Sequence, residues 1–263
     1  MTTENRLRRV WREGRPALDG WLSIGDAFSA EIMAAQGFDT LTVDLQHGAL
    51  DASALLPMLQ AMRAAPVAPL VRVPWREPGI VMRALDAGAM GIICPMVNTA
   101  REAAELVGFL RYPPEGQRSY GPTRAAIAHG GYGLAMGREV VGLAMIETAA
   151  AVKNLDAILA TPGLDGVYVG PTDLAIGVSQ GRLGPGFDRE EPEMIDLIRD
   201  IAARARARGL HAGLHCGSAD YAARAAGWGY DLLTLGGDAR FLAGAAAASL
   251  GRFRALAGDA AAG

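Results

Sequence analysis

Short apolar runs alternate with longer polar-and-apolar segments along most of the chain. The runs are four to six residues long and lack polar alternation, which is typical of parallel strands buried on both faces. They predict eight strands: Asp19–Ser23, Thr40–Asp44, Pro69–Val73, Gly91–Cys94, Val141–Ile146, Gly166–Val169, His211–His215 and Leu232–Leu235.

Between these runs, apolar residues recur at the three- and four-residue spacing of amphipathic helices. Eight strand–helix units in 263 residues predict an α/β fold, a (β/α)8 TIM barrel, and no GxGxxG opens a helix as in a dinucleotide-binding sheet. We expect one domain over residues 1–263, with an N-terminal helix at 4–13, the barrel at about 18–237 and a helical segment at 238–263. The other predicted helices are Phe28–Gln36, Ser53–Ala64, Gly79–Ala87, Thr99–Arg111, Ala149–Ala160, Glu193–Arg208 and Asp220–Trp228.

Three segments fall outside this alternation. Tyr112–Glu139 and Gly177–Pro192 are longer than ordinary barrel loops, and long connections are often functional, so both are candidate lids. The Ala-rich segment after Asp238 either closes the barrel or packs against another subunit through its apolar residues, which are Phe241, Leu242, Leu250 and Phe253.

Composition excludes several classes of function. A net charge of −3 and a pI near 5.8 give no basic surface for nucleic acid. No apolar stretch reaches the roughly 18 residues of a membrane span, and we expect no signal peptide. Cys94 and Cys216 fit no metal or redox spacing, which favours reduced thiols in a cytoplasmic protein. One basic cluster is interpreted as a solvated helix face: Arg6, Arg8, Arg9, Arg12 and Arg15.

Polar residues recur where the predicted strands end, which is where barrel enzymes carry their active sites. Together these positions predict one pocket. They are Trp21, Ser23, Asp44, His47, Arg72, Glu147, Gly170, Pro171, Thr172, Asp173, His215 and Asp238.

Glu147 and Asp173 are the candidate metal ligands, because carboxylates from neighbouring strand ends suit a hard divalent cation. Asp44 could join through water or hold His47. The alternatives are a helix N-terminal carboxylate for Glu147 and a capping aspartate for Asp173.

His47 is the candidate for proton transfer, since the pKa of histidine lies near neutrality. Arg72 is an interior charge suited to an enolate oxygen or a carboxylate, or alternatively to an ion pair with Asp44 or Glu147. His129 and His215 are weaker candidates for chemistry.

Lys153 is the only lysine of the chain and lies inside a helical run beyond a strand end. A barrel enzyme that makes or breaks carbon–carbon bonds needs a lysine Schiff base or a metal as electron sink. If this chain is such an enzyme, its sequence favours the metal.

An ordered set of motifs resembles the HpcH/HpaI aldolases, which are metal-dependent class II pyruvate aldolases. The resemblance runs from about Leu18 to Gly237 and rests on VDLQHGALD, LVRVP, ALDAGAMGIICPMV, GPTRA, MIET and VGPTDLAIG. It implies Mg²⁺, Mn²⁺ or Co²⁺ as cofactor, pyruvate or hydroxypyruvate as enolate donor, an aldehyde as acceptor, and a homohexamer with exchanged C-terminal helices.

The resemblance also implies residue roles. Glu147 and Asp173 would bind the metal, His47 would be the general base and Arg72 would stabilise the enolate. Asp86 would tune the basicity of His47. The amides of Thr172 and Asp173, in the turn Gly170-Pro171-Thr172-Asp173, would hold the keto-acid carboxylate, and the pocket would be lined by Trp21 and Leu214.

Two departures from the family pattern bear on substrate choice. Gln46 stands where the family often has glutamate, and Met145 stands where it has glutamine. A citrate-lyase-β-like or malyl-CoA-type lyase shares the barrel and the metal, and is the nearest alternative. A non-catalytic, effector-binding barrel is the alternative from another class.

Overall fold

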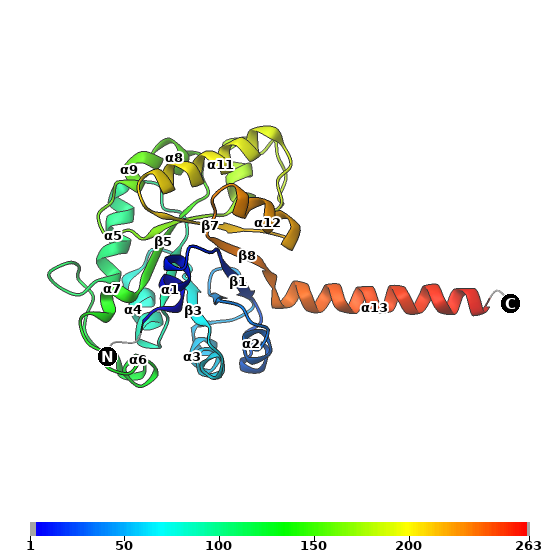
Figure 1. Cartoon of the computed structure of the whole chain (residues 1–263), viewed down its shortest axis with the longest axis horizontal. Coiled ribbons are helices and arrows are strands. Elements are labelled where there is room, and N and C mark those ends of the chain that lie inside the picture. Colours follow the sequence, from blue (N-terminus) through cyan, green and yellow to red (C-terminus); the bar gives the residue numbers. More distant parts are fainter. Residues whose placement is uncertain (1–3, 262–263) are drawn as a thin grey trace.

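Eight parallel strands form a closed barrel in which neighbours in sequence are neighbours in space and β1 pairs with β8 (Figure 1). This computed structural model describes residues 4–261. The (β/α)8 prediction is confirmed. The strands are β1 (Ala17–Leu22), β2 (Thr40–Asp44), β3 (Ala68–Arg72), β4 (Gly91–Cys94), β5 (Val141–Ile146), β6 (Gly166–Val169), β7 (His211–His215) and β8 (Leu232–Gly237).

Helices surround the barrel, and most begin within one or two residues of the predicted positions. Residues 1–3 and 262–263 of the predicted domain lie outside the described residues. The helices are α1 (Arg6–Arg12), α2 (Ala27–Ala34), α3 (Ala52–Ala61) with the 3-10 turn η1 (Met62–Ala64), α4 (Pro78–Asp86), α5 (Ala100–Leu110), α6 (Thr123–Ala128), α7 (Met136–Glu139), α8 (Ala149–Lys153), α9 (Leu155–Leu159), α10 (Pro171–Val178), α11 (Pro192–Ala207), α12 (Ala219–Gly227) and α13 (Asp238–Ala261).

Three helical features differ from the prediction. The segment predicted as one helix over Ala149–Ala160 is divided at Asn154, whose side chain donates to the carbonyl of Asn98. Helix α10 was not predicted, because it begins inside the GPTD turn. Helices α6 and α7 lie within the segment Tyr112–Glu139.

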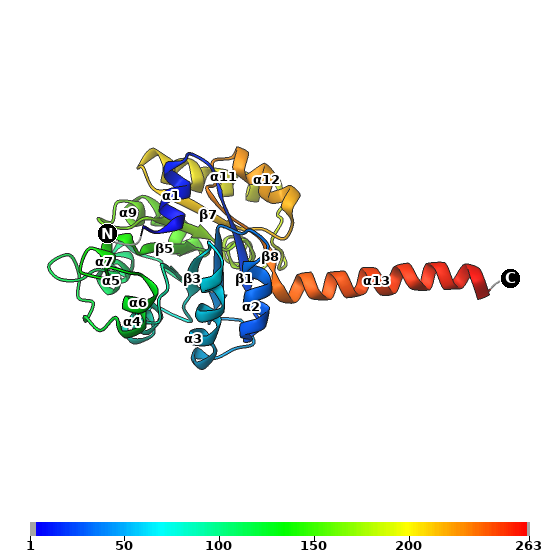
Figure 2. The same cartoon turned by 60° about the horizontal axis from the view of Figure 1, so that its bottom comes forward.

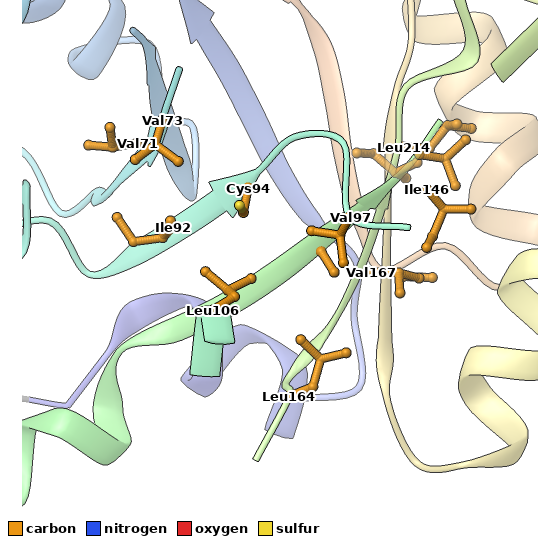
Figure 3. Close-up of a cluster of buried hydrophobic side chains, with 14 of the residues drawn as sticks. Val71, Val73, Ile92, Cys94, Val97, Leu106, Ile146, Leu164, Val167 and Leu214 are labelled. Carbon is orange, nitrogen blue, oxygen red and sulfur yellow. The ribbon is translucent and has the colours of Figure 1, made fainter. Parts of the chain in front are cut away.

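The core has two layers, as the apolar strands require. Outward-facing strand residues pack against the helices. Figure 3 shows this layer, with Val71 and Ile92 from the strands and Leu106 from α5. Inward-facing residues such as Leu70, Ile93 and Leu143 fill the barrel itself. Because side chains alternate between these layers, the register of each strand decides which residues reach the pocket.

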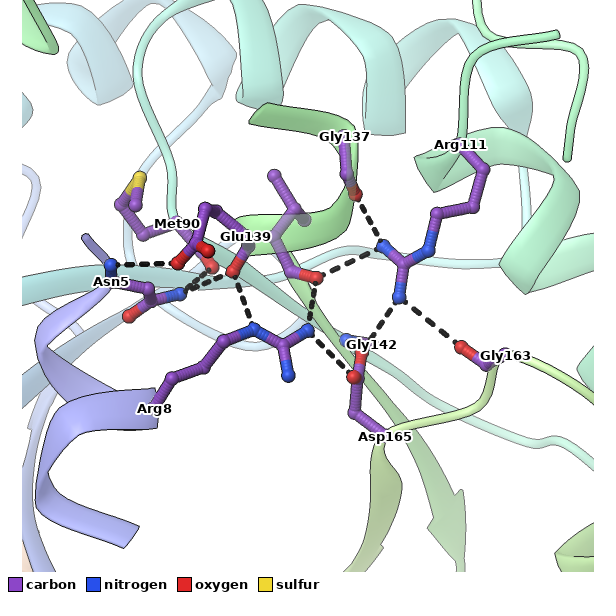
Figure 4. Close-up of polar contacts among 10 residues, drawn as sticks. Asn5, Arg8, Met90, Arg111, Gly137, Glu139, Gly142, Gly163 and Asp165 are labelled. Carbon is purple, nitrogen blue, oxygen red and sulfur yellow. Dashed lines mark hydrogen bonds and ion pairs between the residues drawn. The ribbon is translucent and has the colours of Figure 1, made fainter. Parts of the chain in front are cut away.

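Helix α1 covers the end of the barrel where the strands begin. The Asn5 amide donates to the carbonyls of Met90 and Glu139 at 2.8 Å each, and Arg8 donates to Glu139 and pairs with Asp165 at 2.6 Å (Figure 4). The basic cluster is therefore not simply a solvated face, because Arg6 and Arg15 likewise pair with Asp39.

The segment Tyr112–Glu139 lies at this same end, since it connects the end of α5 to the start of β5. Arg124 donates to the carbonyls of Ala87 and Leu59, and the His129 ring contacts the Gly88 carbonyl at 2.9 Å. The expectation that this segment is a lid for its own barrel is wrong, because the pocket opens at the opposite end.

Helix α13 leaves the barrel after β8 and extends away from it (Figures 1 and 2). Its side chains beyond Asp238 are mostly exposed, so the alternative in which it closes its own barrel does not hold. No helix within residues 4–261 is long and apolar enough to cross a bilayer.

Candidate active site

A cavity of about 440 Å³ opens at the carboxyl ends of the strands. It gathers residues that are up to 219 positions apart in sequence, from Trp21 to Arg240. Most of the predicted site residues line it, namely Trp21, Ser23, Asp44, His47, Arg72, Glu147, Gly170, Pro171, Thr172, Asp173 and His215.

Half-buried Arg72 and buried Asp44 form an ion pair that lines this pocket. Nε and Nη2 of Arg72 donate to the two oxygens of Asp44 at 2.9 and 2.7 Å, and the Trp21 indole donates to Asp44 Oδ2 at 3.1 Å. Burial alone would raise the pKa of Asp44, but hydrogen bonds and charge from Arg72 hold it below its usual value. Asp44 therefore orients Arg72 and stays ionised.

The indole of Trp21 also lies 4.8 Å from the Arg72 guanidinium, which fixes the arginine against an aromatic face. Two of the guanidinium nitrogens face Asp44, so the third, Nη1, is the one left for a ligand. The ion-pair alternative for Arg72 is thus compatible with a role toward substrate.

Glu147 is nearly fully buried, with 3 % of its surface exposed. The Met96 amide donates to its Oε1 at 2.7 Å, and Met96 holds the left-handed φ of 56° that few non-glycine residues adopt. Burial, helped by the charge of Asp173 and opposed by the Met96 amide and the charge of Arg72, raises the pKa of Glu147 to about 7. Two carboxylates face one cavity here.

Gly170 makes room for this carboxylate. A Cβ at Gly170 would lie 2.7 Å from Glu147 Oε2 and 2.9 Å from the end of the Met145 side chain. Only glycine allows β6 to turn into α10 at this distance from Glu147.

Helix α10 begins at the pocket with Pro171 at its first position. The amides of Thr172 and Asp173 come too early in the helix for intrahelical bonds, and no side chain caps it. The Thr172 hydroxyl donates to the Gly186 carbonyl at 3.0 Å, which ties α10 to the following loop. This helix start suits a carboxylate.

His47 lies at the pocket rim with an exposed side chain. The amides of Gln46 and His47 donate to Asp44 Oδ1 at 3.0 and 3.2 Å. Asp44 therefore fixes the loop that presents the imidazole, while the ring stays free to meet a ligand.

The sequence matches a known family over most of its length. Residues 20–245 match the family described as HpcH/HpaI aldolase/citrate lyase. The chain belongs to this family.

Individual HpcH/HpaI relatives cover nearly all of the chain. It is 42 % identical to a hydroxypyruvate/pyruvate aldolase of Rhizorhabdus wittichii over 96 % of this chain and 100 % of that protein. It is 35 % identical to a 5-keto-4-deoxy-D-glucarate aldolase of Citrobacter koseri over 89 % and 90 %. The crystal structure of a family member from Burkholderia cenocepacia superposes with a TM-score of 0.85 and 33 % identity, covering 94 % of this chain and 98 % of that one.

Two residues that the HpcH/HpaI resemblance implied for the site lie elsewhere. Leu214 does not line the cavity, because its neighbour His215 points inward and strand alternation turns Leu214 into the layer beneath the helices. Asp86 ends α4, at the opposite end of the barrel from His47, and pairs with Arg118 at 2.8 Å. Within one chain it does not reach His47.

Lys153, the single lysine, ends α8 with an exposed side chain and does not line the cavity. Within residues 4–261, no group of three or more Asp, Glu, His or Cys side chains has a metal-binding arrangement. Three carboxylates line the cavity, and because Asp44 accepts from Arg72 and Trp21, Glu147 and Asp173 are the two left as candidate metal ligands.

Several pocket residues were not predicted from the sequence, and the bulkiest of them are Tyr168, Phe187 and Arg240. Tyr168 faces inward two positions before Gly170, so strand alternation could have identified it. Phe187 and Arg240 come from a loop and from α13, whose paths no periodicity gives. The Arg240 guanidinium lies 4.9 Å from the Phe187 ring at the pocket rim.

Proposed function

We propose that this chain is a class II aldolase of the cytoplasm. It would add the enolate of pyruvate or hydroxypyruvate to an aldehyde, and in reverse cleave a 4-hydroxy-2-keto acid. The observation that carries the proposal is one cavity in which the buried carboxylate of Glu147 and the exposed carboxylate of Asp173 lie with a free helix start and a fixed arginine. The activities named for its relatives support it.

The carboxylate pair fits a divalent cation, Mg²⁺, Mn²⁺ or Co²⁺. Burial and the charge of Asp173 make the ionised form of Glu147 costly, and a cation between the two would offset that cost. Two protein ligands leave coordination positions for a keto acid. A divalent ion bound there supplies Lewis acidity to the ketone. Asp44, whose oxygens already accept from Arg72 and Trp21, is proposed to contribute through water at most.

The protein's own groups would bind and orient the keto acid. The amides of Thr172 and Asp173 would hold its carboxylate at the start of α10. The indole of Trp21 would form one wall of the pocket. Arg72 would donate from Nη1 to the keto oxygen, where negative charge develops as a proton leaves.

His47 would move the proton. Its imidazole would take a proton from the carbon next to the ketone, giving the enolate, whose carbon then attacks the aldehyde carbonyl. The alkoxide oxygen formed by this attack takes a proton from the protonated His47, directly or through water, which returns His47 to its neutral form and leaves atoms and charge balanced. In the reverse direction the enolate carbon regains its proton from His47.

The proposal is tested by asking whether activity depends on a divalent metal or on Lys153. EDTA should abolish aldol cleavage, and a divalent cation should restore it. Glu147→Gln should weaken metal affinity and activity together, because it keeps the shape and removes a ligand charge. Lys153→Arg is the matched control and should leave activity nearly intact.

Borohydride reduction in the presence of pyruvate separates the two mechanisms directly. We expect an unchanged protein mass, since no imine forms. A pyruvate-sized mass gain at Lys153, or full activity after exhaustive chelation, would contradict the metal mechanism.

The chain is also proposed to assemble as a homohexamer through α13. The exposed apolar side chains of that helix have no cover in their own chain. Asp86 could act on a His47 only if assembly brought it there from another subunit.

A further inference from the structure

A chain of polar side chains crosses the barrel interior and ends at the pocket. Asp19, in β1, is fully buried. Its Oδ2 accepts from the Thr234 hydroxyl at 2.8 Å, Thr234 lies 2.6 Å from the Tyr168 hydroxyl, and that hydroxyl lies 3.2 Å from Nδ1 of His215. A barrel interior is normally filled with apolar side chains, so these groups need a reason.

When Asp19 is ionised, as it mainly is at pH 8, the direction of each hydrogen bond follows from counting protons. Thr40 and Thr42 donate to Asp19 Oδ1, and Thr234 donates to Oδ2. Thr234 has one proton and has given it to Asp19, so it must accept from Tyr168. Tyr168 has likewise given its proton, so its oxygen must accept from Nδ1–H of His215.

This order fixes the tautomer of His215. A neutral imidazole protonated on Nδ1 has a bare lone pair on Nε2. His215 lines the cavity, and within residues 4–261 Nε2 has no hydrogen-bonding partner. A hydrogen-bond acceptor therefore faces the bound substrate.

The ring itself is held rigidly by its aromatic neighbours. Trp21 meets it edge-on with centroids 4.7 Å apart, and Phe187 lies 4.5 Å away. These contacts hold Nε2 in one place on an otherwise apolar wall.

His215 is suited to binding rather than to proton transfer. Burial, followed by the charge of Arg72, lowers its pKa to about 3, although Asp44 opposes this. The charge of Arg240 at the rim is a smaller contribution to the same lowering of the pKa. The imidazole therefore stays neutral at physiological pH.

We propose that Nε2 of His215 accepts a hydrogen bond from a hydroxyl group of the substrate and makes the enzyme prefer hydroxylated substrates. Tyr168, Thr234 and Asp19 are positioning residues that keep the lone pair in the pocket. A substrate without that hydroxyl leaves the acceptor unpaired, which is costly in a buried site. The proposal rests on the aldolase function proposed above.

The hydroxyl could belong to either reactant. One source is the hydroxyl of hydroxypyruvate, and the other is the hydroxyl of an aldehyde such as glycolaldehyde. A panel of four pairs separates them: pyruvate or hydroxypyruvate with glycolaldehyde or acetaldehyde, assayed at pH 8. Burial raises the pKa of Asp19 to about 7, so at this pH its ionised form prevails.

His215→Phe should lower the kcat/KM preference for the hydroxylated reactant roughly 10- to 100-fold. The loss should fall either on the choice between hydroxypyruvate and pyruvate (the donor arm) or on the choice between glycolaldehyde and acetaldehyde (the acceptor arm). Phenylalanine keeps the aromatic packing and loses the nitrogen. Because a ratio is measured, a smaller folded fraction does not affect it. His129→Phe, at the other end of the barrel, is the control and should leave the ratio unchanged.

The positioning residues have a readout that is independent of turnover. The ¹⁵N chemical shifts of the His215 ring at pH 8 should show protonated Nδ1 and bare Nε2. Tyr168→Phe and Thr234→Val should mix the tautomers and lower the preference, whereas Thr234→Ser keeps the hydroxyl and should restore both.

Three results would overturn the inference. They are an unchanged preference in both arms with His215→Phe, an equal loss on all four pairs, or a wild-type ring with its proton on Nε2. A wild-type enzyme inactive on every pair with metal supplied would overturn the aldolase function and this inference with it. An active wild-type enzyme whose preference for the hydroxylated reactant is unaltered in His215→Phe would overturn this inference alone.

Discussion

His47 presents its ring at the pocket rim while Asp44 holds its backbone. We expect His47→Ala to lower turnover by roughly two to four orders of magnitude, the usual contribution of a positioned acid–base group. Pyruvate affinity should change little, because other groups bind the keto acid. Exchange of the pyruvate methyl protons, followed by NMR, measures the step directly, with His129→Ala as the control. Near-wild-type exchange in His47→Ala would move the base to another group.

Two nitrogens of the planar Arg72 guanidinium donate to Asp44, which leaves the third nitrogen to donate to a ligand at the same time. Lysine keeps the charge but cannot bridge both carboxylate oxygens and also reach a ligand. We therefore expect Arg72→Lys to lose most of the turnover in both aldol addition and pyruvate proton exchange. Arg101→Lys, on the exposed face of α5, should change neither. Loss of addition alone would place Arg72 at the aldehyde instead of the enolate.

The turn from β6 into α10 is the element that joins the two halves of the proposed metal site, Glu147 and Asp173. An alanine at Gly170 would push its Cβ against Glu147 Oε2, which is 2.7 Å away, so the carboxylate must move. We expect Gly170→Ala to weaken Mn²⁺ binding roughly 10- to 100-fold in calorimetry, as for groups that orient metal ligands. Gly177→Ala, later in the same helix, meets its nearest neighbour at an ordinary 3.5 Å and is the control. Equal affinity in the two variants would contradict a metal at Glu147.

Strands were easier to predict than the segments between them. Five of the eight predicted strands, β2 and β4–β7, have the observed bounds, because buried parallel strands are continuous apolar runs closed by polar residues. Helix α10 was missed because its Gly-Pro start is also typical of a turn. Leu214 was misplaced because a family motif gives no side-chain direction. Motif order along the chain does not say which end of the barrel a residue occupies, so the position of Asp86 away from His47 within one chain could not be read from it. Its action on His47 stays a prediction that needs a neighbouring subunit. The polar chain from Asp19 to His215 needs three-dimensional neighbours and had no sequence pattern.

At the scale of the whole molecule, α13 is the feature that a single chain does not explain. Leu242, Leu250 and Phe253 lie on one side of the helix and are at least half exposed, with Phe253 at 68 %. An apolar stripe of this kind marks a protein–protein contact. We expect the wild-type chain to sediment as a hexamer and the double variant Leu250→Ser/Phe253→Ser to sediment as a smaller species.

The barrel of that double variant should keep its thermal unfolding transition, because the substituted side chains contact nothing in the core. Ala255→Ser, an exposed position on the opposite side of α13 from these residues, should remain hexameric and is the control. A wild-type chain that is monomeric at micromolar concentration would contradict the assembly. If assembly also brings Asp86 to a neighbouring His47, the smaller species should exchange pyruvate methyl protons more slowly, even at saturating metal. Exchange at the hexamer's rate would instead show that each barrel is catalytically complete.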